Sequence, residues 1–305
     1  PLNKRMMKLA AASLLLMVGS PALAQAPSPS GWSFSLEGGF GVQSETDLDG
    51  DAGSFDLHRT FVAGSVDYRW NYRNSVGVSV GGGRSEYRFY DSVGTEMEEP
   101  WNDIDEMRLS VPMRLALGKT STLFVIPTVR YNGERDASSS DSQTWGLFGG
   151  AAWRLNEDLT IGPGLGVFSR FEDSTRVFPI LIIDWNITER WNLATGRGLA
   201  ASQGPGLTLS YALTPSWKLG LSGRYEEIQF RLDDEGAAPG GVGEDRAMPL
   251  VFNANWSPNP AVRLGVFAGV ELGGELTLYD DRGKKLESRD YDPSALYGAT
   301  FEFNF

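Results

Sequence analysis

Apolar and polar residues alternate one by one along most of this 305-residue chain. In residues 105–117 (DEMRLSVPMRLAL), Met107, Leu109 and Met113 share one face, while Glu106 and Arg114 share the other. A period of two is the pattern of a β-strand whose faces meet different surroundings. The alternation recurs at 32–42, 62–70, 145–155, 207–213, 248–256 and 262–272, and no helical period follows residue 30. The sequence therefore predicts an all-β protein.

Fourteen antiparallel strands fit this pattern. Their expected ranges are 32–43, 57–70, 75–90, 104–117, 122–135, 142–155, 159–171, 175–187, 191–200, 205–214, 217–232, 246–257, 261–279 and 293–305. Short turns, such as 118–121 and 156–158, alternate with longer polar loops, such as 91–103 and 233–245. An even strand count with this alternation is typical of an up-and-down transmembrane β-barrel, with short periplasmic turns and longer extracellular loops. Twelve or sixteen strands are the neighbouring alternatives, because strand boundaries are the hardest feature to place.

The N-terminal segment has the pattern of a secretory signal peptide. Lys4, Arg5 and Lys8 precede an apolar run at 9–18, and the small-residue sequence ALA follows at 22–24. Ten apolar residues are too few for a membrane-spanning helix, which needs about 20. We therefore expect a signal peptide at 1–24, a short periplasmic lead at 25–31 and a barrel at 32–305, with the protein exported to the bacterial outer membrane.

Tryptophans gather at one end of the expected strands. Seven lie near a short turn or near the start of the first strand: Trp32, Trp70, Trp153, Trp185, Trp191, Trp217 and Trp256. Indole rings favour the membrane–water interface, so these residues predict a periplasmic aromatic girdle. A soluble exported β-sandwich is the alternative fold, but it would not confine tryptophan to one end of each strand.

The last strand carries a recognisable ending. In LYGATFEFNF, Tyr297, Phe301, Phe303 and the terminal Phe305 alternate with polar or small residues. This ending resembles the terminal strand of Gram-negative outer-membrane barrels, which implies recognition by the barrel-assembly machinery. Residues 180–305 also resemble an uncharacterised outer-membrane barrel family, a domain of unknown function, through WNLATGRGLAASQGPGLTLSYALT, LGLSGRYEEIQFRL and LGVFAGVELGGELTLYDDRGKKL. That family implies a fold and a location, with no catalytic residues to carry over.

If the apolar faces contact lipid, the opposite faces line the lumen. The charged residues expected there are Asp67, Arg69, Glu106, Arg108, Arg114, Arg130, Arg154, Arg224 and Glu271. Small residues between them, such as Gly39, Gly146 and Gly164, favour open space, while six phenylalanines fall on the same inward phase: Phe61, Phe124, Phe148, Phe168, Phe178 and Phe267. These residues predict a passive channel for a small solute, either polar or amphiphilic. The alternative is a filled lumen in a closed structural barrel that acts through its extracellular loops.

Enzymatic function has little support in the sequence. The only histidine is His58, near Asp56 and Ser54, with no surrounding nucleophile motif, so a hydrolase at the barrel rim is the least favoured reading. The chain has no cysteine, which excludes thiolate chemistry. The spacing Asp47-x-Asp49-x-Asp51 departs from a calcium loop at Ala52. We therefore expect no catalytic residue, metal or cofactor.

Charge indicates which partners to expect. The formal net charge is −12. The charged side chains in residues 1–24 are all basic, so removing this segment would make the protein more acidic. Such acidity argues against nucleic acid. The expected partners are outer-membrane lipid and lipopolysaccharide, the barrel-assembly machinery with periplasmic chaperones, and an unidentified small solute.

Three places depart from simple alternation. The apolar face changes sides near Gly81–Gly83 and near Glu226–Glu227, which predicts β-bulges there. Arg197 would point at lipid unless it snorkels to the outer interface or a bulge at 196–198 turns it inward.

Overall fold

The computed structural model describes residues 30–50, 52–91, 100–171, 175–195 and 206–305. The expected signal peptide at 1–24 and most of the lead at 25–31 lie outside these residues, as do Arg197 and Asp51. Within the described ranges the chain forms strands and turns, and no helix is long and apolar enough to cross a membrane.

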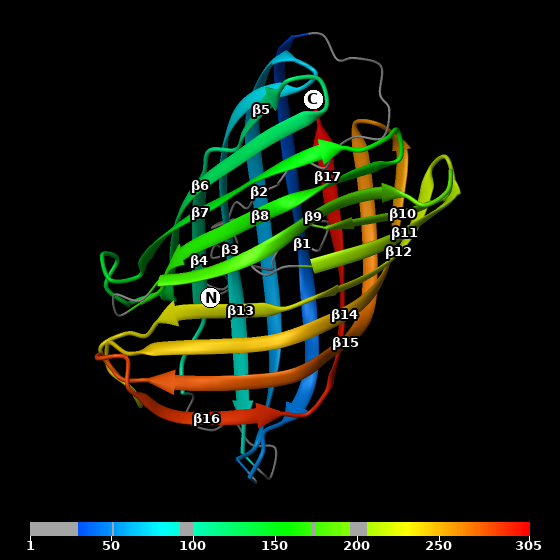
Figure 1. The fold of residues 1–305 in the computed structure, drawn as a ribbon. Coiled ribbons are helices and arrows are strands. Elements are labelled where there is room, and N and C mark those ends of the chain that lie inside the picture. The colour runs from blue at the N-terminus through cyan, green and yellow to red at the C-terminus, as the bar shows by residue number, and fades with distance from the viewer. Residues whose placement is uncertain (1–29, 51, 92–99, 172–174, 196–205) are drawn as a thin grey trace, which may run out of the picture.

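Seventeen strand segments form one antiparallel sheet that closes on itself (Figure 1). They are β1 (Gly31–Asp47), β2 (Ser54–Asn71), β3 (Asn74–Tyr90), β4 (Ile104–Ser110), β5 (Met113–Leu117), β6 (Ser121–Glu134), β7 (Gln143–Arg154), β8 (Leu159–Ser169), β9 (Thr175–Asn186), β10 (Trp191–Thr195), β11 (Gly206–Thr214), β12 (Trp217–Arg224), β13 (Glu226–Arg231), β14 (Val242–Asn259), β15 (Val262–Tyr279), β16 (Lys285–Tyr291) and β17 (Ser294–Asn304). Three pairs, β4/β5, β12/β13 and β16/β17, are each one strand with a short interruption. The barrel therefore has fourteen strands, which confirms the predicted fold class and count.

The barrel is closed by its first and last strands. β1 pairs with β17 from Ser35↔Asn304 to Gln43↔Leu296, and with β2 on its other edge. Closure removes the free edges that would leave backbone N–H and C=O groups unpaired in lipid. The alternating terminal sequence thus pairs directly with the first strand.

The outer face of the barrel is apolar over the height of a membrane. On β14, Met248, Leu250, Phe252 and Trp256 are exposed, while Val251 between them is buried. The nine residues from Met248 to Trp256 match the length of a strand that crosses the hydrocarbon core. This exposed apolar band identifies the surface that contacts lipid.

Nine of the strand segments continue beyond this band and form a narrower closed ring, which we call the cap ring. In order around the ring they are β13, β14, β15, β16, β1, β2, β3, β4 and β6, and β6 returns to β13. The bridge Leu48↔Tyr291 joins β16 to β1, and Gly133↔Arg231 joins β6 to β13. Figure 1 shows β13–β16 side by side at the lower end, opposite the C-terminus.

The interior of the cap ring is filled by apolar side chains, which we call the cap core. Its aromatic members are Phe55, Tyr87, Phe89, Trp101, Phe230 and Tyr291. Ring centroids lie 5.0 Å apart for Phe55 and Tyr291 and 5.1 Å apart for Trp101 and Phe230. Edge-to-face contacts at these distances stabilise the core beyond simple burial.

The cap ring corrects two expectations. The predicted loops 233–245 and 280–292 are partly strand, because β14 begins at Val242 and β16 covers Lys285–Tyr291. The predicted bulges at Gly81–Gly83 and Glu226–Glu227 are wrong, because β3 keeps its register with β2 from Ser75 to Tyr90 and β13 continues the register of β12 on β14. The apolar face changes sides there because each strand leaves lipid and enters the cap core.

Glycines on the inner face let aromatic rings lie flat against the wall. A Cβ built at Gly166 would lie 2.5 Å from the Phe178 ring, and one at Gly146 would lie 2.3 Å from the Phe168 ring. Real Cβ atoms do not approach this closely, so a larger residue would displace the ring.

We therefore predict that Gly166→Ala destabilises the barrel by about 1–3 kcal/mol. Urea unfolding of the refolded protein in lipid vesicles, followed by tryptophan fluorescence, measures this. The matched control is Gly41→Ala, whose Cβ would meet the Phe267 ring at an ordinary 3.6 Å. Equal stability of the two variants would contradict the proposed packing.

Candidate functional site

One wall of the lumen is aromatic and aliphatic. Phe124 stacks on Phe148 at 5.4 Å and Phe168 stacks on Phe178 at 5.6 Å, across strands β6–β9. Ile180 and Ile182 continue the same inward phase on β9, with the exposed Leu181 between them on the outer face. This wall explains why residues 177–183 are apolar on both faces: one face meets lipid and the other packs inside the barrel.

The small inward residues do not simply create open space. Gly146, Gly164 and Gly166 lie under the side chains of Phe168, Ile182 and Phe178. The expectation that such glycines widen the lumen is therefore incomplete, because their main contacts are the rings that cover them.

A buried ion cluster lies next to the cap core, on the side that faces the membrane-spanning part of the barrel. The Arg59 guanidinium donates to Asp245 at 3.0 Å and to Glu226 at 3.3 Å, which ties β2 to β14 and β13. Glu271 on β15 is buried beside them, 1% exposed. One cation therefore faces the carboxyl groups of three acidic side chains in a region where unpaired charge is costly.

Two tyrosines of the cap core complete this cluster. The hydroxyls of Tyr87 and Tyr291 donate to the two oxygens of Asp245 at 2.8 and 3.1 Å. Burial, with the Asp245 carboxylate beside it, raises the pKa of Tyr87 well above its ordinary value. Burial raises the pKa of Tyr291 in the same way. Both hydroxyls therefore keep their protons and donate them to the Asp245 carboxylate.

The space beside this cluster is small. A cavity of about 20 Å³ lies between Arg59, Phe61, Glu106 and Ile228. A water molecule fills about this volume of probe-occupied space. Ile104 of the cap core also lines this cavity, so little space separates the ion cluster from the cap core.

The sequence-predicted lumen residues fall into three levels. Glu271 belongs to the ion cluster under the cap core, and Arg108 donates to Glu106 at 2.8 Å nearby. Arg130 lies over the Phe168 ring at 5.1 Å, where a charged wall meets the aromatic wall. Arg224, half-buried, is on β12.

The third level is near the periplasmic mouth. Arg69 and Arg154 lie close enough to Arg114 for their charges to repel it. Asp67 accepts from the Ser65 hydroxyl at 3.3 Å. The structure thus brings Arg69, Arg114 and Arg154 together at the turn end of the barrel, and their role in lining a solute path stays a prediction.

The predicted girdle residues are all exposed. The seven tryptophans named above have exposed fractions between 37% and 67%. Trp217 and Trp256 are direct neighbours in the ladder, and Trp191 packs against Tyr211 at 4.8 Å. Tyr297 and Phe305 are exposed as well, while Phe301 and Phe303 are partly buried. The membrane-interface and insertion roles of these residues stay predictions.

The features around His58 do not form a catalytic arrangement. Its Nε2 lies 3.7 Å from Asp56, but the Ser54 hydroxyl donates to Glu45 at 2.6 Å. Among the residues that the structure describes, no group of three acidic or histidine side chains is arranged to hold a metal ion.

Sequence reasoning missed the ion cluster and the cap core. The residues on either side of Arg59 and of Asp245 are polar. The alternation of apolar and polar residues therefore did not predict that these two side chains point inward. The available signal was the aromatic pair Tyr87 and Phe89 on the face that is small or polar earlier in the same strand. Such an exchange of faces indicates a strand that leaves lipid for a protein core.

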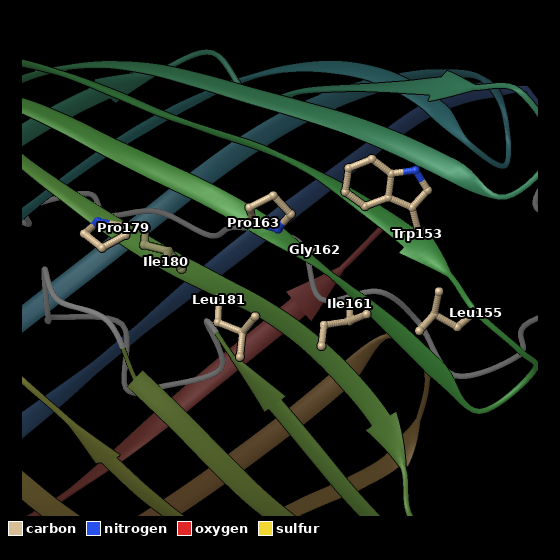
Figure 2. Close-up of a pocket in the computed structure, with 8 residues that line it drawn as sticks. All are labelled: Trp153, Leu155, Ile161, Gly162, Pro163, Pro179, Ile180 and Leu181. Atoms are coloured by element: carbon tan, nitrogen blue, oxygen red, sulfur yellow. The ribbon is translucent and has the colours of Figure 1, made fainter.

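A shallow apolar groove of about 650 Å³ lies on the outer wall (Figure 2). Trp153, Pro163, Pro179 and Leu181 line it from β7, β8 and β9. Most of these side chains are on the exposed apolar face. The groove is therefore part of the lipid-facing surface and not of the lumen.

Closed topology, an apolar outer band and charged groups on the inner face define a transmembrane β-barrel. Solved structures share the fold: an outer membrane channel from Pseudomonas putida F1 aligns with TM-score 0.51 and 10% identity over 91% of this chain and 97% of its own. A Pseudomonas aeruginosa FadL homologue aligns with TM-score 0.50 and 12% identity over 89% of this chain and 90% of its own. No family model and no curated protein sequence matches the chain, so the resemblance of residues 180–305 to an uncharacterised family has no family model behind it.

We predict that Arg59→Gln destabilises the folded barrel by about 3–5 kcal/mol, because it leaves buried carboxylates without their cation. The measurement is urea unfolding in lipid vesicles. The matched control is Arg263→Gln, which breaks the more exposed Arg263–Glu302 pair and should cost about 1 kcal/mol or less. A loss for Arg59→Gln no larger than the control would show that the cluster does not hold the cap.

Proposed function

We propose that the protein is a passive channel of the outer membrane for small amphiphilic solutes. The observation that carries the proposal is an aromatic wall on β6–β9 that meets charged groups inside the same barrel, with Arg130 lying over the Phe168 ring at 5.1 Å. A solute with an apolar body and a polar group would contact both. One protein of similar fold is an outer membrane channel, which agrees with this proposal.

Charged groups provide a second support. Arg69, Arg114 and Arg154 gather at the periplasmic end, and Arg108 and Arg130 lie further in. Charged rings of this kind bias which ions and polar solutes pass through a pore. Export through residues 1–24, insertion through the assembly machinery and contact with lipopolysaccharide belong to the same proposal.

A closed structural barrel is the second candidate, and the cap core favours it. Six aromatic side chains fill the cap ring across the barrel axis. In that case the protein would act through its extracellular surface, and inserted protein would pass no current.

The first experiment is single-channel recording of the refolded protein in a planar lipid bilayer. We expect discrete current steps, with an ion selectivity that shifts toward cations in Arg114→Ala, because a positive charge is removed from the path. Confirmed insertion without any steps would overturn the channel and favour the closed barrel.

A second experiment tests the solute class. We predict that the double change Phe168→Ala and Phe178→Ala lowers the preference for benzoate over a neutral sugar of similar size by about 2–10-fold, since an aromatic contact contributes about 0.5–1.5 kcal/mol. Uptake into proteoliposomes measures this preference. Phe40→Ala, on the exposed outer face, is the control and should leave it unchanged. An unchanged preference in the double variant would exclude the aromatic wall as a solute contact.

A further inference from the structure

The cap ring has one join unlike the others. β13 pairs with β14 along its whole length, from Glu226↔Ala247 to Arg231↔Val242. Its other edge meets β6 at a single bridge, Gly133↔Arg231, and this pairing is parallel, whereas the strand ladders of the barrel are antiparallel. We call the contact between β6 and β13 the seam.

Side chains supply most of the remaining contacts at the seam. Asn132 donates from Nδ2 to the Gln229 carbonyl at 3.2 Å. The Glu134 carboxylate accepts from the Asp233 backbone N–H at 2.7 Å. Because a few bonds of this kind replace a ladder, the seam separates with less loss of hydrogen bonding than the antiparallel ladders β13–β14 and β4–β6 on either side of it. The β16–β1 join also has a single bridge, Leu48↔Tyr291, but that bridge is antiparallel.

Ion pairs hold β13 and β14 over the ends of the shorter strands. Arg170, just past β8, donates to Glu244 at 2.5 Å, and Arg176 on β9 pairs with Glu227. Arg176 also lies over the Tyr225 ring at 5.8 Å. These contacts join the β13–β14 side of the cap ring to the neighbouring ends of β8 and β9.

Irregular backbone lies at the base of the segments that carry this edge. The β14–β15 register shifts between Arg246 and Met248, opposite Gly273, whose φ of +60° is in the left-handed region. The ladder is also interrupted at Tyr225 between β12 and β13. Bulges and interruptions of this kind are places where a sheet bends.

We propose that the seam is the gate of the channel: β13 separates from β6, and the cap core moves off the barrel axis. The proposal rests on the proposed channel function and names how that channel is controlled. The closed ring with its filled core is then the shut state. Breaking one parallel bridge and its side-chain contacts opens it, while the antiparallel ladders stay intact.

A disulfide across the seam tests the gate. Gly133→Cys with Arg231→Cys places two thiols on directly bridged residues, within the Cα separation that a disulfide requires. The chain has no other cysteine. A Cβ at position 133 would lie 2.8 Å from the Ser142 hydroxyl, so every variant, including the controls, also carries Ser142→Ala.

The matched control links two strands within the cap ring that move together. Thr277 and Ser288 are ladder partners on β15 and β16, with hydroxyls 2.9 Å apart. Thr277→Cys with Ser288→Cys therefore adds a disulfide without crossing the seam. The single variant Arg231→Cys controls for loss of the hydrogen bonds that Arg231 donates to the Asp141 and Gly240 carbonyls at 3.1 and 2.9 Å, and Gly133→Cys controls for the added side chain.

Single-channel recording is then made under oxidising and reducing conditions, with cross-linking and folding verified by gel mobility. We expect the seam variant to conduct when reduced and to lose at least ten-fold in open probability when oxidised, while the control pair conducts equally in both states. Equal currents from the cross-linked seam variant would overturn the gate and leave the channel standing. Silence of the protein with native residues at the seam would overturn the channel and the gate together.

Discussion

Backbone hydrogen bonding in lipid is the constraint on which the rest of this structure depends. A strand inside a membrane must pair on both edges, because no water is present to satisfy its N–H and C=O groups. The pairing of β1 with β17 meets this requirement by joining the two ends of the sheet. Once the sheet is closed, each side chain in the membrane points either at lipid or into the lumen.

Beyond the lipid band this requirement relaxes, and the architecture changes with it. Water can satisfy backbone groups there, and nine strand segments continue past the band to form the cap ring. The continuing segments bury a new apolar core on their inner faces. β3 shows the exchange: Val78 and Val80 face outward to lipid, and Tyr87 and Phe89 face inward to the cap core, with no break in register.

The ion cluster beside the cap core costs free energy to bury, and it also fixes how several strands meet. Arg59 is buried with an excess of carboxylates, an arrangement that packed apolar residues would match in stability. Its contacts specify how β2, β13 and β14 meet beside the cap core. Two joins of the cap ring rest on a single bridge, Leu48↔Tyr291 and Gly133↔Arg231, and the second, at the seam, is the parallel one.

The sequence by itself determined the fold class, the fourteen strands and the direction in which most side chains point. It did so because the alternation of apolar and polar residues is a local property of each strand that has one face in contact with lipid. It also placed Arg114, Arg130 and the six inward phenylalanines on one phase. Only the tertiary structure decided that Gly133 meets Arg231, that Arg59 bridges to Asp245, and that glycines lie under aromatic rings. These contacts join segments about 100 or more residues apart in two of the three cases. Local alternation carries no information about which distant strands meet once they leave the membrane.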